Sequence, residues 1–540
     1  MDSAPRPDEN PAAPEPLSSL LTASQELRVR AWNGEDVRAE SSEAFDRAVG
    51  LVHGDGAQWA AAAAANALVA QYGNFESEEE GALYVRRCGN FLDLLNGLPS
   101  EPWVHGRKAM IHAVVADFAA APGELKDGLR KAYEAAVASG EPDLVCRTAH
   151  SYALHLAYDD TETPADEGFP AAREVFAVAR EHCAEGEDPD LVCHIHLHSA
   201  IVAEALGEVL EASRLARTAI AAGVADESPL NVGHAHAIVA EAALHRGDPH
   251  AAESHSRSAL LLGERVAADQ PWLVLTAHFG LAQAGLALER HEEALAHARE
   301  ALRLYDDGVR TTASATFSFD VWETIAGLHE GMEDFDSAVE ALVKGAAVAE
   351  EAGYMPRAAQ MIRRRTWILW ETGGVLGNFG DRCEEFSDLV QRLAVESKEF
   401  ERNPDYSHLC GLELAETLDQ RSQLKEAMMD LLTEYGEDGM AVSVDEAQAA
   451  LWDDLIDDCH SAWQGFVLNP MRDEDRIIGT GLRLIALFCY SRRPRAALEV
   501  AAEVREVFAD IGDPVVIDGL NDRIENLRGL VRSVEGDDLA

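Results

Sequence analysis

The stretch AHAIVAEAALHRGDPHAAESHSRSALLLGE, residues 235–264, holds two alanine-rich segments with helical spacing on either side of the polar turn GDPHAA, 247–252. Ala240 in the first segment and Ala252 in the second are twelve residues apart. Two antiparallel helices joined by a tight turn need small residues where their backbones approach most closely. The stretch therefore predicts a helical hairpin.

The same spacing recurs along the chain. Pairs of small residues twelve positions apart occur at Ala200/Ala212, Ala240/Ala252, Ala282/Ala294 and Ala326/Ala338. A second small residue follows seven positions later in each second segment, at Ala219, Ala259, Ala301 and Gly345. A related pair, Ala153 and Ala172, is nineteen residues apart, followed again by Ala179. We expect its seven extra residues to form a surface loop in the acidic stretch 159–170.

A proline motif opens each of four successive copies. It reads PDLVC at 142 and at 189, PLNVG at 229 and PWLVL at 271, with spacings of 47, 40 and 42 residues. A period of this size made of helix pairs is typical of an α-solenoid. The composition agrees, because 47% of residues are hydrophobic but only 6% are aromatic, so the apolar residues are mainly helix formers. The predicted fold is all-α, a solenoid of antiparallel helical hairpins.

Residues 235–264, 278–306 and 321–346 resemble tetratricopeptide repeats. Each has a small residue in the middle of its first helix, a short polar turn, and an alanine that opens the second helix. Trp322 stands near the start of a first helix, where the family has an aromatic residue. The period exceeds the usual ~34 residues of the family. The chain thus resembles a long-helix variant found beside bacterial signalling and regulatory ATPases. Over roughly 140–350, the resemblance implies a superhelix whose first helices line a concave binding surface.

Four regions are predicted along the chain. Residues 1–16 are rich in proline and predict a disordered acidic tail. Residues 17–140 predict N-terminal helical hairpins, 141–353 the tetratricopeptide-like repeats, and 354–540 divergent C-terminal repeats. In the last region Ala415/Ala427 and Ile485/Ala497 are again twelve residues apart. The glycine-rich stretch 371–381 predicts a break or kink between two arrays.

The charge of the chain restricts its partners. With 45 basic and 96 acidic residues, the formal net charge is −51, which argues against nucleic acid and anionic membrane surfaces. This net charge either keeps the protein soluble or attracts a basic partner. No apolar run approaches the ~18 residues of a membrane span, and the start shows no apolar core of a signal peptide. The eight scattered cysteines form no CxxC pair, so we expect reduced, buried thiols and a cytoplasmic location.

Histidines gather in the repeats, and three interpretations remain open. In CHIHLH, His194 and His198 share one helical face, and His234 occupies the equivalent position of His194 in the next copy. These histidines predict a metal site, a histidine-lined groove, or ordinary packing and surface residues. Because no HExxH and no zinc-finger spacing occurs, we expect no metal and no cofactor.

Two further clusters have a functional and a structural interpretation. WDDLIDDC, 452–459, predicts a solvated acidic face, with a cation site as the alternative. Arg363–Arg365 with Trp367 and Trp370 predict an internal stripe of ion pairs, with a docking patch for an acidic partner as the alternative. No GxxxxGK[ST] or GxSxG motif occurs, and no GxGxxG follows a strand. We therefore expect a non-catalytic protein.

The predicted function is a scaffold or adaptor that binds a peptide or partner protein, of basic character, in a concave groove. The alternatives are a regulator whose solenoid wraps a small molecule or signalling peptide, and a metal-dependent enzyme at the histidines. Histidine protonation below about pH 6.5 would weaken a basic partner's attraction. The resemblance places these side chains in the groove: Arg147, His150, His194, Leu197, Ile201, Glu204, His234, Glu241, His245, Phe279, Gln283, Asp320 and Glu323.

Overall fold

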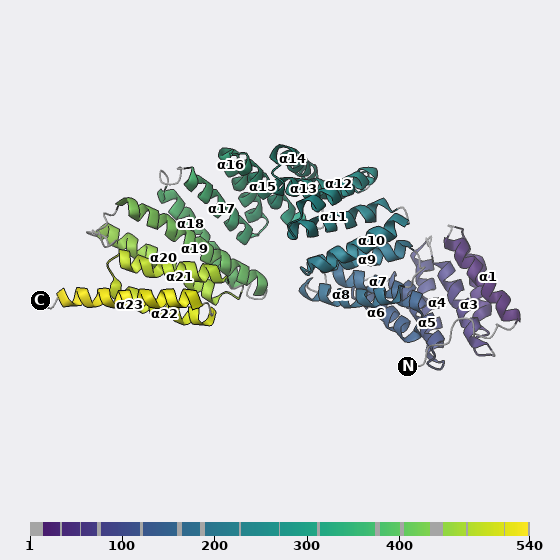
Figure 1. Ribbon diagram of the computed structural model, residues 1–540. Helices are drawn as coiled ribbons and strands as arrows, with labels where there is room; N and C mark the ends of the chain where they lie inside the picture. Colours follow the sequence, from purple (N-terminus) through teal and green to yellow (C-terminus); the bar gives the residue numbers. More distant parts are fainter. Residues whose placement is uncertain are drawn as a thin grey trace. The chain divides into compact units, whose positions relative to one another are not determined.

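The computed structural model describes residues 15–32, 35–54, 56–72, 77–118, 122–158, 165–183, 189–225, 228–268, 270–309, 314–372, 379–399, 404–432, 446–470, 473–511 and 514–537. Within these ranges the chain is all-α: it forms 23 helices and no strand. Consecutive helices pack as hairpins, as the ribbon shows (Figure 1), so the predicted fold class is confirmed. Residues 1–14 of the predicted tail lie outside the described residues.

The chain divides into two units, with the division between Ala284 and Gly285. This division falls in the last turn of a helix within the predicted repeat region 141–353. The helices up to that point are α1 (Glu15–Trp32), α2 (Arg38–Val49), α3 (Ala57–Gln71), α4 (Glu78–Asn96), α5 (Pro102–Ala116), α6 (Pro122–Ser139), α7 (Pro142–Tyr158), α8 (Ala165–His182), α9 (Pro189–Ala205), α10 (Val209–Ala225), α11 (Pro229–His245), α12 (Pro249–Val266) and α13 (Pro271–Ala287).

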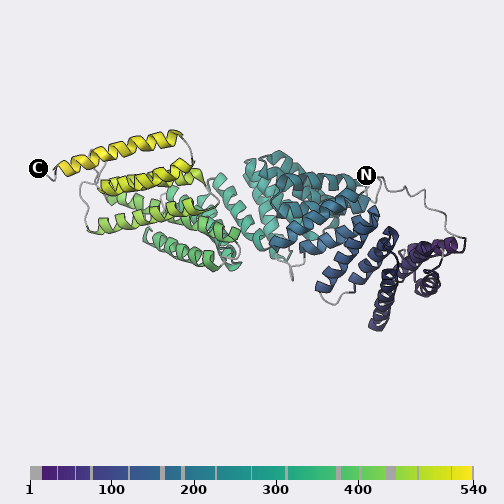
Figure 2. The ribbon, with the colours of Figure 1, turned by 90° about the horizontal axis from the view of Figure 1, so that it is seen from below.

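Unit 2 continues the succession of helices, from teal through green to yellow in Figures 1 and 2. Its helices are α14 (His291–Asp306), α15 (Ser314–Gly331), α16 (Phe335–Glu351), α17 (Met355–Glu371), α18 (Phe379–Glu399), α19 (Pro404–Leu432), α20 (Glu446–Leu468), α21 (Glu474–Tyr490), α22 (Pro494–Ile511) and α23 (Pro514–Asp537).

The small residues that define the repeat are buried. Within 141–353, each alanine of the predicted pairs is at most 2% exposed, and Gly345 is buried as well. The predicted helix register is confirmed by this burial. The four proline motifs also open helices α7, α9, α11 and α13 at their first residue. Proline suits this position because the first amide of a helix has no intrahelical acceptor and the fixed φ is already helical.

The turns between paired helices share one hydrogen-bond pattern. The amide of Glu208 donates to the carbonyl of Ala203 at 2.8 Å, and the amide of Asp248 donates to the carbonyl of Ala243 at 2.9 Å. This bond, five residues back, ends a helix with one residue in the left-handed region. Gly207 and Gly247 occupy that residue with φ of 73° and 70°. The turn therefore has a fixed length, which keeps the small residues twelve positions apart.

The helices approach closely where glycine meets alanine. A Cβ placed on Gly285 would lie 2.6 Å from Cβ of Ala294 on the next helix. A Cβ on Gly465 of α20 would lie 2.8 Å from Cβ of Ala415 on α19. Real Cβ atoms do not come this close, so these crossings depend on glycine on one helix and alanine on the other.

Two sequence predictions about local structure are wrong. Ala415 and Ala427 do not mark a hairpin, because both lie in α19, one continuous helix of 29 residues. The segment between them has no glycine or proline to end a helix, whereas Ser491 and Arg492 form a turn between Ile485 and Ala497. The expected loop at 159–170 is shorter than predicted, because α8 begins at Ala165 and includes Pro170. Residues 159–164, and 373–378 of the glycine-rich stretch, lie outside the described residues.

The N-terminal core is built around α3. Its alanines from Ala60 to Ala65 are almost completely buried, and they pack with side chains of α1, α2 and α5. An alanine-only helix can be covered on every side because each neighbour comes close to its backbone. None of the described helices has both the length and the hydropathy needed to cross a bilayer.

The buried alanine register yields a first test. We expect Ala252→Leu to lower the free energy of unfolding by about 1–3 kcal/mol, because the added carbons overpack a site that is 0% exposed. Ala221→Leu on the exposed face of α10 is the matched control and should change little. Denaturant titration of both variants measures this difference, and equal stability of the two would contradict the register.

Candidate functional site

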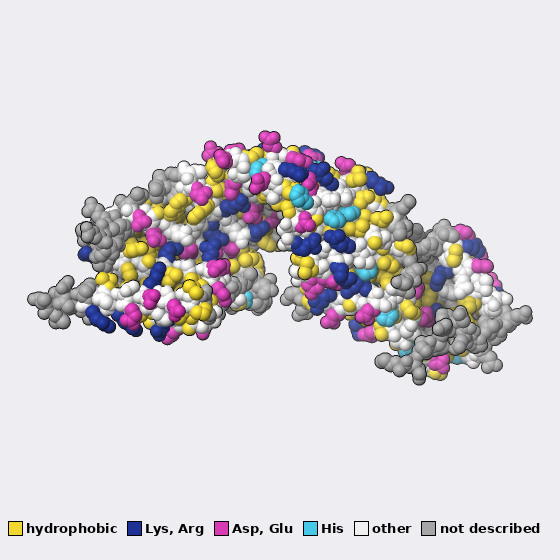
Figure 3. Space-filling model, viewed as in Figure 1, with side chains coloured by type: hydrophobic (Ala, Val, Ile, Leu, Met, Phe, Trp, Pro, Cys, Tyr) yellow, Lys and Arg dark blue, Asp and Glu magenta, His cyan; other side chains and the backbone are white. Residues whose placement is uncertain are grey.

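Most of the predicted groove residues lie on α7, α9 and α11, three helices that pack side by side in unit 1. We call the surface formed by the predicted residues of these three helices the unit 1 face. Arg147 and His150 come from α7, the residues from His194 to Glu204 from α9, and His234, Glu241 and His245 from α11. Figure 3 shows histidines at the surface among acidic and basic side chains.

The structure brings histidines of α7 and α9 into contact. Nε2 of His150 lies 3.1 Å from Nδ1 of His198. The rings of His194 and His198 stack with their centroids 5.8 Å apart. Nδ1 of His194 lies 3.0 Å from the carbonyl oxygen of Asp190, and its Nε2 lies 3.1 Å from the side-chain nitrogen of Asn231. Because a carbonyl only accepts, Nδ1 of His194 donates and Nε2 accepts from the Asn231 amide.

Burial keeps several of these imidazoles neutral. It lowers the pKa of His150 to about 3, with the neighbouring His198 and His194 adding to the effect. Burial and His194 lower the pKa of His198 to about 4, and burial and His198 lower that of His234 to about 4. The expectation that His234 gains charge just below pH 6.5 is therefore wrong. The proximity and partial burial of the three histidines disfavour a proton on any of them.

Two carboxyl groups meet at the other end of the face. Glu204 of α9 hydrogen-bonds to Glu241 of α11, and burial together with this second carboxylate raises the pKa of Glu204 to about 8. Glu241 is 59% exposed, and its Oε1 lies 3.9 Å from Nε2 of His245. Burial and Glu204 also raise the pKa of Tyr158 on α7. Burial and the second carboxylate therefore favour the protonated form of Glu204, which lies inside, while Glu241 lies toward solvent.

The remaining unit 1 candidates have different surroundings. Arg147 is exposed, and its Nε donates to Asp143 on its own helix at 2.8 Å. Leu197 is 3% exposed and packs in the core of α9, α10 and α11, so it does not face a groove. The reason is its position, one turn before Ala200, where α9 meets α10. Ile201, Phe279 and Gln283 are half-buried.

The last two candidates belong to unit 2 and are engaged there. Arg357 of α17 lies 2.5 Å from Asp320 and 3.2 Å from Glu323, both on α15. Arg364, two helical turns after Arg357 on α17, lies 3.8 Å from Glu323. These carboxylates are therefore neutralised by arginines of the neighbouring helix. The structure does not gather all thirteen predicted residues on one surface.

In the described ranges, no group of three or more His, Cys, Asp or Glu side chains is arranged to hold a metal ion. The contacts between His150, His194 and His198 are hydrogen bonds and ring contacts.

The basic stripe of α17 is internal, as the sequence predicted. Arg363 lies 2.5 Å from Glu413 and 3.0 Å from Glu416 on α19, and it is only 15% exposed. Arg365 pairs with Glu385 of α18. With Arg364 bound to Glu330 at 2.8 Å, all three arginines have carboxylate partners on other helices. The interpretation as internal ion pairs is confirmed.

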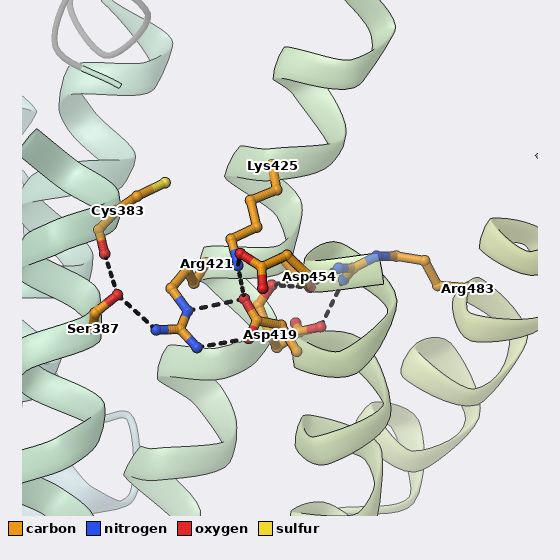
Figure 4. A network of polar contacts seen from close by, with 9 residues as sticks. Cys383, Ser387, Asp419, Arg421, Lys425, Asp454 and Arg483 are labelled. Carbon is orange, nitrogen blue, oxygen red and sulfur yellow. Dashed lines mark hydrogen bonds and ion pairs between the residues drawn. The ribbon is translucent and has the colours of Figure 1, made fainter. Parts of the chain in front are cut away.

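A second buried ionic network connects α19, α20 and α21, and Figure 4 shows it at close range. Both oxygens of Asp458 are bound by Arg421, at 2.6 and 2.9 Å, and Lys425 lies 2.7 Å from the same carboxylate. Arg483 of α21 donates to Asp419 of α19 at 2.6 Å. Each of these five side chains is less than a fifth exposed.

The prediction of a solvated acidic face at 452–459 is therefore right for some of its aspartates and wrong for another. Asp453 and Asp454 are 60% and 72% exposed, as on a solvated face, but Asp458 is 8% exposed. It is buried because α20 packs between α19 and α21. Matched spacing could have revealed the pairing: Arg421 and Lys425 are four residues apart, as are Asp454 and Asp458.

Between α17, α19 and α21 lies an open pocket of about 530 Å³ in unit 2. It is lined by polar side chains beside one aromatic ring: Gln360, Arg363, Arg364, Trp367, Glu416 and Arg476 are among them. Trp367 is 48% exposed and stacks on Trp370, with 6.4 Å between ring centroids. The volume is that of a small-molecule site, although the lining is more polar than usual.

The lowered histidine pKa values make stability depend on pH. The unfolded chain takes up a proton on each histidine near pH 6.5, whereas His198 in the fold takes one up only near pH 4. The unfolded state thus binds more protons, so the free energy of unfolding falls as pH drops from 6.5 to 4. We expect His198→Gln to remove roughly 1–3 kcal/mol of this fall. Urea titrations at several pH values measure it, and a His198→Gln variant with the pH dependence of the wild type would contradict the burial of His198.

The buried network gives a comparison within one helix. We expect Asp458→Asn to lower the free energy of unfolding by about 3–5 kcal/mol, because it leaves the buried Arg421 without its carboxylate and Lys425 with only the exposed Asp454. Asp453→Asn, at an exposed pair with Arg493, should cost less than about 1 kcal/mol. Denaturant titration measures the free energy of unfolding of both variants. Similar decreases in the two would mean that Asp458 is solvated.

No family model matches the chain, and no curated protein matches its sequence. Solved helical-repeat structures do match. A Rap protein complexed with Competence and Sporulation Factor is 12% identical, with a TM-score of 0.37, over 85% of this chain and 99% of that one. Aspartyl phosphate phosphatase F from Bacillus subtilis is 14% identical, with a TM-score of 0.36, over 66% and 96%.

A third match is a signal transduction ATPase with numerous domains and a tetratricopeptide repeat sensor, from Pyrococcus horikoshii. It is 12% identical, with a TM-score of 0.36, over 92% of this chain and 74% of that one. The chain is an all-α protein of consecutive helical hairpins, and these solved structures are similar to it at low sequence identity.

Proposed function

We propose that this chain is a non-catalytic binding protein that holds a peptide or protein segment on the unit 1 face through a basic side chain of the partner. The observation that carries the proposal is the carboxyl pair of Glu204 and Glu241, in which burial and mutual repulsion keep a proton on Glu204. The repulsion between two neighbouring carboxylates is relieved either by a proton or by a bound cation.

A lysine or arginine side chain would replace that proton. Glu241 is 59% exposed and open to a partner, whereas Glu204 lies behind it, so an incoming cation reaches both carboxylates from solvent. Its charge favours the ionised form of Glu204, and the proton leaves. Charge-assisted hydrogen bonds to two carboxylates then replace a single shared hydrogen bond.

The neutral histidines suit the same ligand. His150, His198 and His234 have lowered pKa values and carry no charge at neutral pH, so they do not repel a basic segment. The half-buried Ile201, one turn before Glu204 on α9, offers apolar contact near the carboxyl pair, and the histidine rings extend the face away from it. A segment with one basic residue and an apolar neighbour therefore fits the face.

The net charge of −51 supports the same choice of partner. A strongly acidic protein attracts basic segments over distances up to the Debye length, about 8 Å at physiological ionic strength. This attraction raises the association rate more than it raises affinity. The carboxyl pair would supply the specific contact after encounter.

Selection from a displayed peptide library tests the proposal. We expect the full chain to select peptides with Lys or Arg beside apolar residues, and Glu241→Lys to abolish their binding. Because binding drives a proton off Glu204, we expect tighter binding at pH 8 than at pH 6. Calorimetry in two buffers of different ionisation enthalpy should show release of a proton near pH 7.

The control variant is Glu264→Lys, at an exposed position of α12, which makes the same charge change outside the unit 1 face. It should keep the selected peptides bound with a modest loss of association rate. Selection of peptides without basic residues, or equal losses from Glu241→Lys and Glu264→Lys, would count against the carboxyl pair as the binding site.

The second candidate function is a regulator that senses a small polar ligand in the unit 2 pocket. It is favoured by one observation: three arginines, the carboxylates of Glu416 and Asp419, and the exposed face of Trp367 line an opening of about 530 Å³. Thermal-shift screening of small carboxylates and amino acids would separate the two candidates. A ligand whose stabilising effect is lost in Arg476→Gln, but not in Glu241→Lys, supports the sensor.

A further inference from the structure

Two thiols of unit 1 lie in contact although they are 37 residues apart in sequence. Cys146 belongs to the second turn of α7, and Cys183 directly follows the last residue of α8. Their Sγ atoms are 2.9 Å apart. All eight cysteines of the chain lie among the described residues, and each is a thiol rather than half of a disulfide.

The two thiols differ in their access to solvent. Cys146 is 0% exposed, whereas Cys183 is half-buried at the end of its helix. The side chains of Tyr133, Val175 and Leu191 pack around the pair. A reagent in solution therefore reaches Cys183 first, and Cys146 sits directly behind it.

We propose that Cys146 and Cys183 are a modification site, at which exchange with a low-molecular-weight disulfide forms a reversible disulfide between α7 and α8. The thiol of Cys183 loses its proton, and its sulfur attacks one sulfur of the small disulfide. That S–S bond breaks, and one small thiol leaves with a proton from solution. Cys183 is left in a mixed disulfide.

Cys146 then completes the exchange. Its thiol loses a proton, and its sulfur attacks the Cys183 sulfur from 2.9 Å away. The second small thiol leaves and is protonated, so two protein thiols are oxidised and one small disulfide is reduced to two thiols. Because the attack is intramolecular between positioned groups, it outpaces attack by other thiols.

The neighbouring cysteines do not share this arrangement. Cys193 on α9 is 0% exposed and packs with Leu197 in a separate core cluster. Cys383 and Cys489 are half-buried, and burial raises the pKa of both thiols. The new bond would join the start of α7 to the end of α8. It would therefore close the hairpin that carries His150 into a covalent loop.

Disulfide mapping tests the proposal on the full chain. The protein is incubated with oxidised glutathione, remaining thiols are blocked with iodoacetamide, and the digest is analysed by mass spectrometry. Trypsin leaves Cys146 in peptide 132–147 but leaves Cys183 and Cys193 together in 181–214. A second cleavage before Asp188 and Asp190 separates those two cysteines.

We expect a Cys146–Cys183 link in the wild type, lost on treatment with dithiothreitol. Cys146→Ala should instead accumulate glutathione on Cys183, because the resolving thiol is gone. Cys193→Ser is the matched control and should retain the link. Circular dichroism checks that each variant is folded.

Three results would overturn the proposal. One is glutathione on Cys383 or Cys489 of the wild type without any Cys146–Cys183 link. Another is a link from Cys146 to Cys193. The third is a stable mixed disulfide on Cys183 of the wild type, because a thiol in contact should have displaced it.

Discussion

Close contact between helix backbones is the constraint on which the repeats depend. The contact exists only where one helix presents glycine or alanine, as at Gly285 against Ala294 and Gly465 against Ala415. The turn fixes where that contact falls, because the amide of Asp248 bonds to the carbonyl five residues earlier and the helix direction reverses at once. Together these features set the helix length and bring α7, α9 and α11 side by side. The unit 1 face follows from that arrangement.

The sequence predicted the repeats well because their determinants are local. Alanine spacing and proline positions depend on one turn and one crossing, so Ala200, Ala240 and Ala326 could each be placed from neighbouring residues. The same rule failed at Ala415 and Ala427. Spacing alone does not make a turn, and no residue between them ends a helix.

The site was harder to predict because it depends on which helices become neighbours. Leu197 has the helical position of a groove residue, yet α10 covers it. Asp320 and Glu323 have the right spacing too, but the arginines that neutralise them lie on α17. The contact of His150 with His198 and of Glu204 with Glu241 joins helices of different hairpins. No pattern within one segment specifies such pairs.

The distribution of basic residues makes the surface more acidic than the composition alone indicates. Arg363, Arg365, Arg421 and Arg483 are each less than a fifth exposed, and they bind carboxylates inside unit 2. Burying an ion pair removes equal numbers of both signs from the surface. Since basic residues are the minority, the remaining exposed set has a higher ratio of acids to bases than 96 to 45.

The continuous helix α19 limits how this protein can change in evolution. At 29 residues it is about 44 Å long, and its side chains form ion pairs with α17, α20 and α21. A hairpin of unit 1 could be duplicated or deleted by joining two similar turns, because the turns share one geometry. Loss or gain of a helix around α19 would leave several buried charges without their ion-pair partners at once. Length variation among descendants of this sequence should therefore accumulate before α17, while the helices from α17 to α21 are inherited as a block.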